Sequence, residues 1–319
     1  MRLELVRQHE AVPSSPDTAL VVPDEFVAEV ADGGEVALRW INSLPGLVAD
    51  LAAKWDVELE LGSPRFGANA LVVLGDRRGE RCALKASRPD HSISSEAEGL
   101  RVWDGSGAVR LLEWSSKDNV LLLEGLDPDH SLEAVPLDTA AEVVGLLTRR
   151  LAVPAPEGFV GALEFGESTQ AYLSKQSELG APLPDEWVAL ANRVLDDLVR
   201  TTSRMLVPSD LHAGNVLRAR REPWLAIDPR PVVGDPEISI ADLLLWHLPL
   251  DAALTDVTSL LETMVTAGDL DPLRARDWTI VRAVSRWLWC CDADADLPPD
   301  APRCSVCAPR CTRILEALI

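Results

Sequence analysis

The segment Ser209-Asp-Leu-His-Ala-Gly-Asn-Val-Leu217 holds the densest group of polar side chains in this sequence. Thirteen residues after its asparagine comes Asp228, inside Trp224-Leu-Ala-Ile-Asp-Pro229. The apolar runs Val216-Leu217 and Leu225-Ala-Ile227 between these landmarks predict two short strands joined as a hairpin. Such a hairpin brings the polar groups that flank it to one end of the paired strands.

The polar groups at that end are Asp210, Asn215 and Asp228. A carboxylate, an amide oxygen and a second carboxylate form an all-oxygen set, which suits Mg²⁺. The carboxylate that does not hold the metal can accept a proton from a hydroxyl nucleophile. Phosphoryl transfer needs this division of roles, because its catalysis is mainly positioning and charge neutralisation.

Working outward, the pattern predicts a small β-rich lobe followed by a larger helical lobe, which is the α+β class. Residues 1–56 have helical patterning, and Pro45 with Gly46 predicts a break into two short helices there. Strand-like runs and one helix follow up to Glu124, and helical patterns dominate after Gly125. We therefore expect lobes at residues 1–124 and 125–319.

The net charge of −21 narrows the classes of partner. It repels phosphate backbones and anionic lipid, so we expect neither nucleic acid nor membrane as a partner. We expect a cationic or polyhydroxylated small molecule as the substrate. No secretory signal or stretch long enough to span a bilayer stands out, so we expect a cytoplasmic protein.

These motifs resemble a known family. Asp210-Leu-His-x-Gly-Asn-Val-Leu217 with Asp228 is similar to the catalytic segment of aminoglycoside phosphotransferases, which have a protein-kinase-like fold. The run Arg221-Glu-Pro-Trp-Leu-Ala-Ile-Asp-Pro-x-Pro-x-Val-Gly-Asp-Pro236 resembles the branch of streptomycin 6-kinases and hydroxyurea phosphotransferases. So do Gly99-Leu-Arg-x-Trp103 and Val109-Arg-Leu-Leu112.

The resemblance implies a role for each matching residue. Asp210 is the expected catalytic base, and Asn215 with Asp228 is expected to hold Mg²⁺ on the phosphates of ATP. Lys85 is expected to contact the phosphates and to pair with Glu96, with Glu98 as the second candidate. The resemblance also implies that the connection between the lobes binds adenine, through Leu123, Glu124 and Leu126. The segment from Gly62 to Gly67 is the expected loop over the phosphates.

The composition supports a special role for Lys85. The chain has only four lysines, and a lysine within the apolar strand Ala83-Leu-Lys85 is costly unless it meets an anion. The alternative is a lysine whose ammonium group reaches solvent at the end of the strand.

A second group of candidate ligands lies near the C-terminal end of the chain. Cys304, Cys307 and Cys311, with Cys290 upstream, supply enough thiolates for a structural zinc site. The alternative is that Cys290 belongs to a buried helix and the other thiols have no common role.

The sequence therefore predicts an ATP- and Mg²⁺-dependent kinase for a hydroxyl of a small molecule, and a streptomycin-type aminoglycoside is the first candidate. An amino sugar such as glucosamine and hydroxyurea are alternative acceptors. A nucleotide-binding pseudokinase is the alternative of another class.

Overall fold

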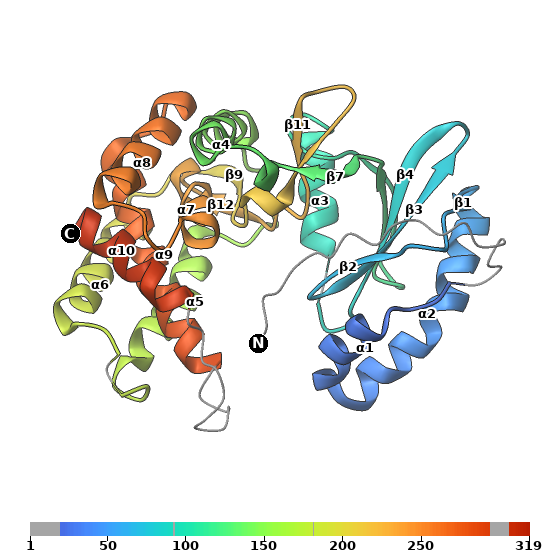
Figure 1. The fold of residues 1–319 in the computed structure, drawn as a ribbon, viewed down its shortest axis with the longest axis horizontal. Coiled ribbons are helices and arrows are strands. Elements are labelled where there is room, and N and C mark those ends of the chain that lie inside the picture. Colours follow the sequence, from blue (N-terminus) through green and yellow to red (C-terminus); the bar gives the residue numbers. More distant parts are fainter. Residues whose placement is uncertain (1–19, 92, 181, 294–305) are drawn as a thin grey trace. The chain divides into compact units, whose positions relative to one another are not determined.

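The chain divides between Asp127 and Pro128 into two compact units, seen here in a computed structural model (Figure 1). The structure describes residues 20–91, 93–180, 182–293 and 306–319. The sequence boundary was expected at Glu124, three residues before this division. The predicted α+β class is confirmed, since the first unit contains the large sheet and the second contains most of the helices.

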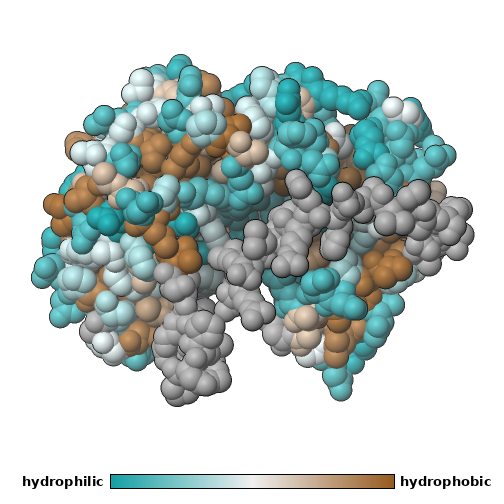
Figure 2. Space-filling model, in the orientation of Figure 1, coloured by the Kyte–Doolittle hydropathy of each residue, from teal (hydrophilic) through white to brown (hydrophobic). Residues whose placement is uncertain are grey.

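The first unit is built on an antiparallel sheet in the order β1-β3-β4-β6-β5, with β2 also paired to β3. Its strands and helices are α1 (Asp24–Val30), α2 (Gly34–Trp55), β1 (Glu58–Leu59), β2 (Arg65–Gly67), β3 (Ala70–Arg77), β4 (Glu80–Ser87), α3 (Ser94–Trp103), β5 (Leu111–Ser115) and β6 (Val120–Glu124). Charged residues follow one another at the tip of the β3–β4 hairpin, which is hydrophilic in Figure 2.

Helix α2 runs without interruption through Pro45, so the prediction of two short helices is wrong. A proline inside a helix costs about 3 kcal/mol, because it removes a hydrogen bond and crowds the preceding turn. The buried face of α2 offsets that cost. Trp40, Leu44 and Val48 pack with strand residues such as Leu84 in one apolar cluster, and each buried side chain of this size contributes about 1.5–3 kcal/mol.

The same packing fixes the direction of Lys85. Leu84 and Ala86 on β4 belong to the cluster with α2, and successive side chains of a strand point to opposite faces. Lys85 therefore lies on the other face of the sheet, where α3 supplies Glu96.

The second unit combines helices with two three-stranded sheets, β11-β10-β7 and β12-β9-β8. Its strands are β7 (Asp127–Ser131), β8 (Val153–Pro154), β9 (Met205–Pro208), β10 (Val216–Arg218), β11 (Trp224–Ala226) and β12 (Pro231–Gly234). Its α-helices are α4 (Leu137–Leu151), α5 (Ala162–Leu173), α6 (Asp185–Arg200), α7 (Ala241–His247), α8 (Leu254–Gly268), α9 (Pro272–Ala293) and α10 (Cys307–Leu318). Short 3₁₀ turns lie at Ala31–Gly33 in the first unit and, in the second, at Leu132–Ala134, Ser174–Gln176, Ala213–Asn215 and Pro236–Ser239.

Helix α9 organises the second unit, because it packs against α5, α6, α7, α8 and α10. Its anchor is Asp235, which is 2% exposed. This carboxylate accepts hydrogen bonds from the indole of Trp278 at 2.8 Å and from the backbone of Ser203 at 2.8 Å, and it also pairs with Arg274. Among the described residues, no helix is both long enough and apolar enough to cross a membrane.

Candidate active site

The predicted hairpin is present and aligns the catalytic segment. Val216 pairs with Ala226, and Arg218 pairs with Trp224. One residue before the hairpin, the carbonyl of Asn215 accepts a hydrogen bond from the amide of Ile227 at 2.8 Å. Asn215 therefore lies beside Ile227, the residue that directly precedes Asp228.

Asp210 is brought to the same place by the pairing of β9 with β12. Ser209 donates its backbone amide to the carbonyls of Pro229 and Arg230, each at 3.1 Å, and its hydroxyl to the Arg230 carbonyl at 2.9 Å. The side-chain amide of Asn215 also donates to the carbonyl of Asp210 at 3.0 Å. The structure thus gathers all three residues predicted for the catalytic segment.

The chain around Asp228 is strained. Asp228 has φ 47° and Arg230 has φ 44°, in the left-handed region that residues with a Cβ avoid. Such residues persist only where the surrounding structure over-determines them, and they cluster at functional sites. The hydrogen bonds from Ser209 supply that constraint here. One result is that Nε of Arg230 lies 3.2 Å from Oδ2 of Asp210, so a guanidinium faces the candidate base.

His212 has a structural role in this loop. Its Nδ1 accepts a hydrogen bond from the amide of Gly214 at 3.1 Å, which caps the turn that contains Asn215. Its ring lies 5.4 Å from that of Trp246 and 5.7 Å from that of His247. Burial lowers the pKa of His247 to about 4, and His212 and Arg310 add to the effect. His247 is therefore neutral at neutral pH, and its contact with Glu133 is not an ion pair there.

Two residues that sequence reasoning missed, Arg282 and Ser239, hold the catalytic loop from behind. Arg282 on α9 donates to the carbonyl of Ser209 at 3.3 Å and pairs with the buried carboxylate of Asp242. The hydroxyl of Ser239 donates to the carbonyl of Pro208 at 2.6 Å. These partners lie 31 to 73 residues from the loop in sequence, so no local pattern could have indicated them.

In the first unit, Lys85 and Glu96 form a buried ion pair. The ammonium Nζ of Lys85 lies 2.9 Å from both carboxylate oxygens of Glu96, and the two residues are 8% and 6% exposed. The alternative of a lysine that reaches solvent therefore does not hold. The pair fixes the ammonium group of Lys85 on the face of the sheet opposite α2.

The glycine loop differs from the expectation. Arg65–Gly67 is strand, paired with β3 from Val72 to Ala70, so the segment from Gly62 to Gly67 is not one loop. The turn that leads into β3 consists of Ala68 and Asn69. The reason is the antiparallel pairing of Phe66 with Leu71, which extends the strand as far as Gly67. A Cβ on Gly67 would meet no atom within 4 Å, so no close contact requires glycine there.

The predicted adenine-binding residues lie at the end of β6. Leu123 is buried and pairs with Ala83. The backbone amide of Glu124 already donates to the carbonyl of Arg110 at 2.9 Å. Leu126, in the connection after the strand, makes no backbone hydrogen bond to other described residues. Within the described part of the chain, the Leu126 backbone therefore has capacity for a ligand.

The donor set on the second unit fits Mg²⁺. Asn215 uses its amide nitrogen within the loop, and its Oδ1 accepts no hydrogen bond from the described residues. That oxygen and the neighbouring carboxylate of Asp228 are hard donors, as Mg²⁺ prefers.

The zinc prediction is not supported by the part of the chain that the structure describes. Cys307 and Cys311 have their sulfurs 4.0 Å apart, and hydrogen bonds from Cys290 and Cys311 lower the pKa of Cys307 to about 3. Within the described residues, however, no group of three His, Cys, Asp or Glu side chains could hold a metal ion. Cys304 lies outside the described residues, so the four-thiolate site stays a prediction.

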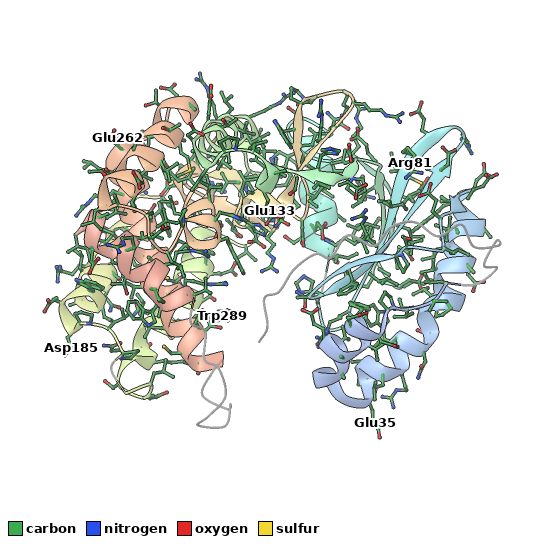
Figure 3. All side chains as sticks on the ribbon, in the orientation of Figure 1. Glu35, Arg81, Glu133, Asp185, Glu262 and Trp289 are labelled. Carbon is green, nitrogen blue, oxygen red and sulfur yellow. The ribbon has the colours of Figure 1, made fainter. Side chains whose placement is uncertain are left out.

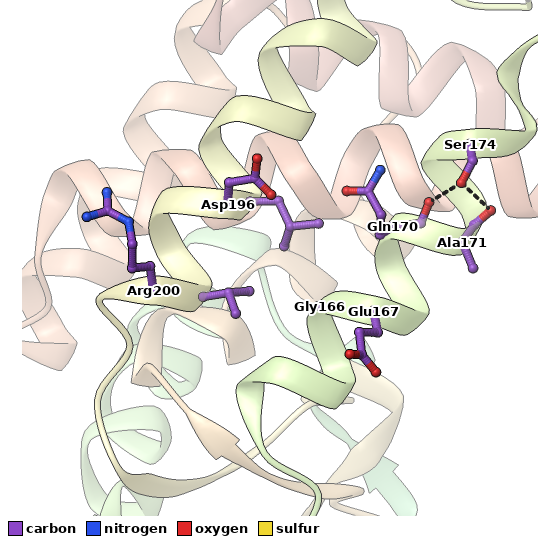
Figure 4. A pocket seen from close by; sticks show the side chains of 9 residues that line it. Gly166, Glu167, Gln170, Ala171, Ser174, Asp196 and Arg200 are labelled. Atoms are coloured by element: carbon purple, nitrogen blue, oxygen red, sulfur yellow. Dashed lines mark hydrogen bonds between the residues drawn. The ribbon is translucent and has the colours of Figure 1, made fainter.

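An open groove of about 670 Å³ lies between α5 and α6 (Figure 4). Its polar side chains include Glu167, Gln170, Asp196 and Arg200. None of the residues predicted from the sequence lines it. We therefore do not assign the groove to the candidate active site.

Comparison with known proteins agrees with this geometry. Residues 54–293 match the family described as aminoglycoside/hydroxyurea antibiotic resistance kinase. The chain is 35% identical to a streptomycin 6-kinase of Streptomyces glaucescens, an alignment that covers 88% of this chain and 94% of that protein. It is 36% identical to a hydroxyurea phosphotransferase of Kitasatospora aureofaciens, with 84% of this chain and 79% of that protein covered.

A solved structure shows the same fold at lower sequence identity. It is a thermostable mutant of the aminoglycoside phosphotransferase APH(4)-Ia, crystallised as a ternary complex with AMP-PNP and hygromycin B. The TM-score is 0.54 at 16% identity, with 84% of this chain and 97% of that chain covered. The predicted kinase-like fold and phosphotransferase class are confirmed, and the chain belongs to the aminoglycoside/hydroxyurea antibiotic resistance kinase family.

Proposed function

We propose that this protein transfers the γ-phosphoryl group of ATP to a hydroxyl of a streptomycin-type aminoglycoside. The observation that carries the proposal is the gathering of Asp210, Asn215 and Asp228 at one end of the hairpin, in a chain 35% identical to a streptomycin 6-kinase. Because the reaction uses ATP, we place it in the cytoplasm.

In the proposed reaction, the acceptor hydroxyl forms a bond to the γ-phosphorus while the bond to the β–γ bridging oxygen breaks, and ADP leaves. Asp210 orients the hydroxyl and takes its proton. Asn215 and Asp228 would hold Mg²⁺, which when bound neutralises charge on the phosphates. Lys85, fixed by Glu96, binds the α- and β-phosphates.

The electrostatics of the chain favour a cationic acceptor. With a net charge of −21, the protein attracts a guest that carries guanidinium or ammonium groups. Attraction between exposed charges is screened over about 8 Å at physiological ionic strength. KM for a polycation should therefore rise with added salt, whereas KM for a neutral acceptor should hardly change.

Hydroxyurea is the second candidate acceptor, because a hydroxyurea phosphotransferase is 36% identical to this chain. It is small and uncharged, so the salt test separates it from streptomycin. Glucosamine, with one amine, should show an intermediate dependence.

The test is ADP release with streptomycin, glucosamine and hydroxyurea at low and moderate salt, compared as kcat/KM. Asp210→Asn is the matched variant, since the amide keeps the shape of the side chain but cannot take up the proton. We expect turnover of streptomycin with a salt-dependent KM, and loss of that turnover in Asp210→Asn. A better kcat/KM for hydroxyurea or glucosamine would replace the acceptor. No acceptor-dependent turnover at all would favour the pseudokinase.

A further inference from the structure

Helix α9 presents one continuous face that begins at the catalytic loop. Arg282, Arg286 and Trp289 are spaced by four and three residues, so they lie on the same side of the helix. The first of them donates to the carbonyl of Ser209, the residue before Asp210. Seven residues of helix rise about 10 Å. The backbone of Trp289 therefore lies about 10 Å along α9 from that of Arg282, which contacts the loop.

These side chains form a stack that connects the loop to solvent. The ring of His212 lies 5.4 Å from Trp246, and the guanidinium carbon of Arg286 lies 3.9 Å from the centre of the Trp246 ring. The same carbon lies 4.5 Å from the centre of the Trp289 ring. Trp289, which is labelled in Figure 3, is the outer end of the stack, and its side chain is 39% exposed. Its indole is thus held in place from the inner side and open on the other.

We propose that Trp289 is a binding platform for a distal amino-sugar ring of the acceptor, whose reacting hydroxyl is placed at Asp210. The inference rests on the proposed function and narrows its substrate class to a cationic acceptor of more than one ring. Hydroxyurea has no ring to place on an indole and no cationic group, so it would gain nothing from such a platform.

The chemistry of the stack selects the kind of contact. Arg286 already occupies the inner face of the indole, so a second cation on the outer face meets a ring whose negative face is partly neutralised. The apolar C–H face of a sugar is the better partner for that surface. The cationic group of the sugar then needs a carboxylate beside the ring.

Asp292 provides that carboxylate, three residues after Trp289 and therefore on the same face of α9. It now pairs with Lys175 at 2.5 Å, and both side chains are 36% exposed. An ion pair this exposed contributes little to stability. An ammonium or guanidinium group of the ligand can therefore take the place of Lys175 at small cost.

The test compares Trp289→Ala, Trp289→Phe and Leu273→Ala. Leu273 is the control, since it is 69% exposed and lies in the first turn of the same helix. Trp289→Ala should raise KM for streptomycin about three- to tenfold, while kcat and KM for ATP stay unchanged. Trp289→Phe, which keeps an aromatic face, should recover most of the loss, and Leu273→Ala should behave as wild type.

The outcomes separate this inference from the proposed function. If the wild type phosphorylates streptomycin and Trp289→Ala leaves its KM unchanged, the platform is refuted and the proposed function stands. A loss in Trp289→Ala that Trp289→Phe does not recover also refutes stacking. If the wild type phosphorylates no acceptor, the proposed function fails. Streptomycin binding by calorimetry then decides the platform, and equal affinity in wild type and Trp289→Ala overturns it.

Discussion

The buried pair of Lys85 and Glu96 offers a way to separate stability from function. In Lys85→Met the carboxylate of Glu96, 6% exposed, loses the ammonium that lies 2.9 Å from both of its oxygens. Removing one partner of a buried pair costs about 3–5 kcal/mol, because the other charge stays desolvated without compensation. Replacing both partners by apolar residues of similar volume is often neutral. Lys85→Met/Glu96→Leu should therefore lie within about 1 kcal/mol of the wild type.

Activity should not follow stability in this pair. The double variant lacks the cation proposed for the phosphates, so its kcat should stay reduced by about 10²-fold or more. Urea unfolding, monitored by tryptophan fluorescence, measures the free energy of unfolding, and ADP release measures kcat. Arg39→Met is the control, because the Arg39–Glu35 pair on α2 is 69% and 89% exposed and should contribute less than about 1 kcal/mol.

Two results would contradict the reasoning. If the double variant is as unstable as Lys85→Met, the loss of the ammonium group beside Glu96 is not the source of the cost. If the double variant turns over substrate at nearly the wild-type rate, the lysine is a structural group and its proposed contact with phosphates is refuted.

Three further predictions concern the second unit. Asp228→Ala should weaken MgATP binding more than Asn215→Ala, since it removes a charge as well as a ligand; equal affinities by calorimetry would count against the metal site. Asp235→Ala should cost about 3–5 kcal/mol in urea unfolding, because the indole of Trp278 and the guanidinium of Arg274 lose their buried acceptor; a cost below 1 kcal/mol would remove its role as anchor. For His247, the folded pKa of about 4 lies below the unfolded value of 6.5, so the unfolded state binds the extra proton and stability falls from pH 6.5 towards pH 4, by up to about 3 kcal/mol. His247→Phe should flatten that part of the curve, and an unchanged slope would assign it to other groups.

The sequence predicted the catalytic segment because its geometry is local. Asn215 and Asp228 are separated by a single hairpin, and the apolar runs that form it are visible without any knowledge of the rest of the fold. Lys85 was indicated for a similar reason, since a lysine between small and apolar residues of a strand is unusual. The contact with Glu96 spans only eleven residues.

The misses have physical causes of two kinds. Helix α5 lies outside the helical patterns expected near residues 138–151, 184–205, 239–249, 255–267 and 272–291. Gly166 and the run Ser168-Thr169 are weak helix formers, and packing against α6 and α9 decides the outcome. Pro45 predicted a helix break, but the burial of the apolar face of α2 outweighs the local cost of the proline. The third miss, Arg282, depends on how α9 docks on the loop, which no local pattern encodes.

The distribution of charge in the second unit explains why its catalytic loop can hold strained residues. Asp235 and Asp242 are each 2% exposed and bind arginines of α9, so they fix the backbone on both sides of the loop. Asp228 and Arg230, by contrast, adopt left-handed angles that cost roughly 1–2 kcal/mol each. The buried pairs are far more costly to break than the strain is to keep, so the loop cannot relax. The carboxylates proposed for the chemistry are therefore held by groups with no proposed part in it, and the acceptor contacts proposed on the outer part of α9 can change without disturbing them.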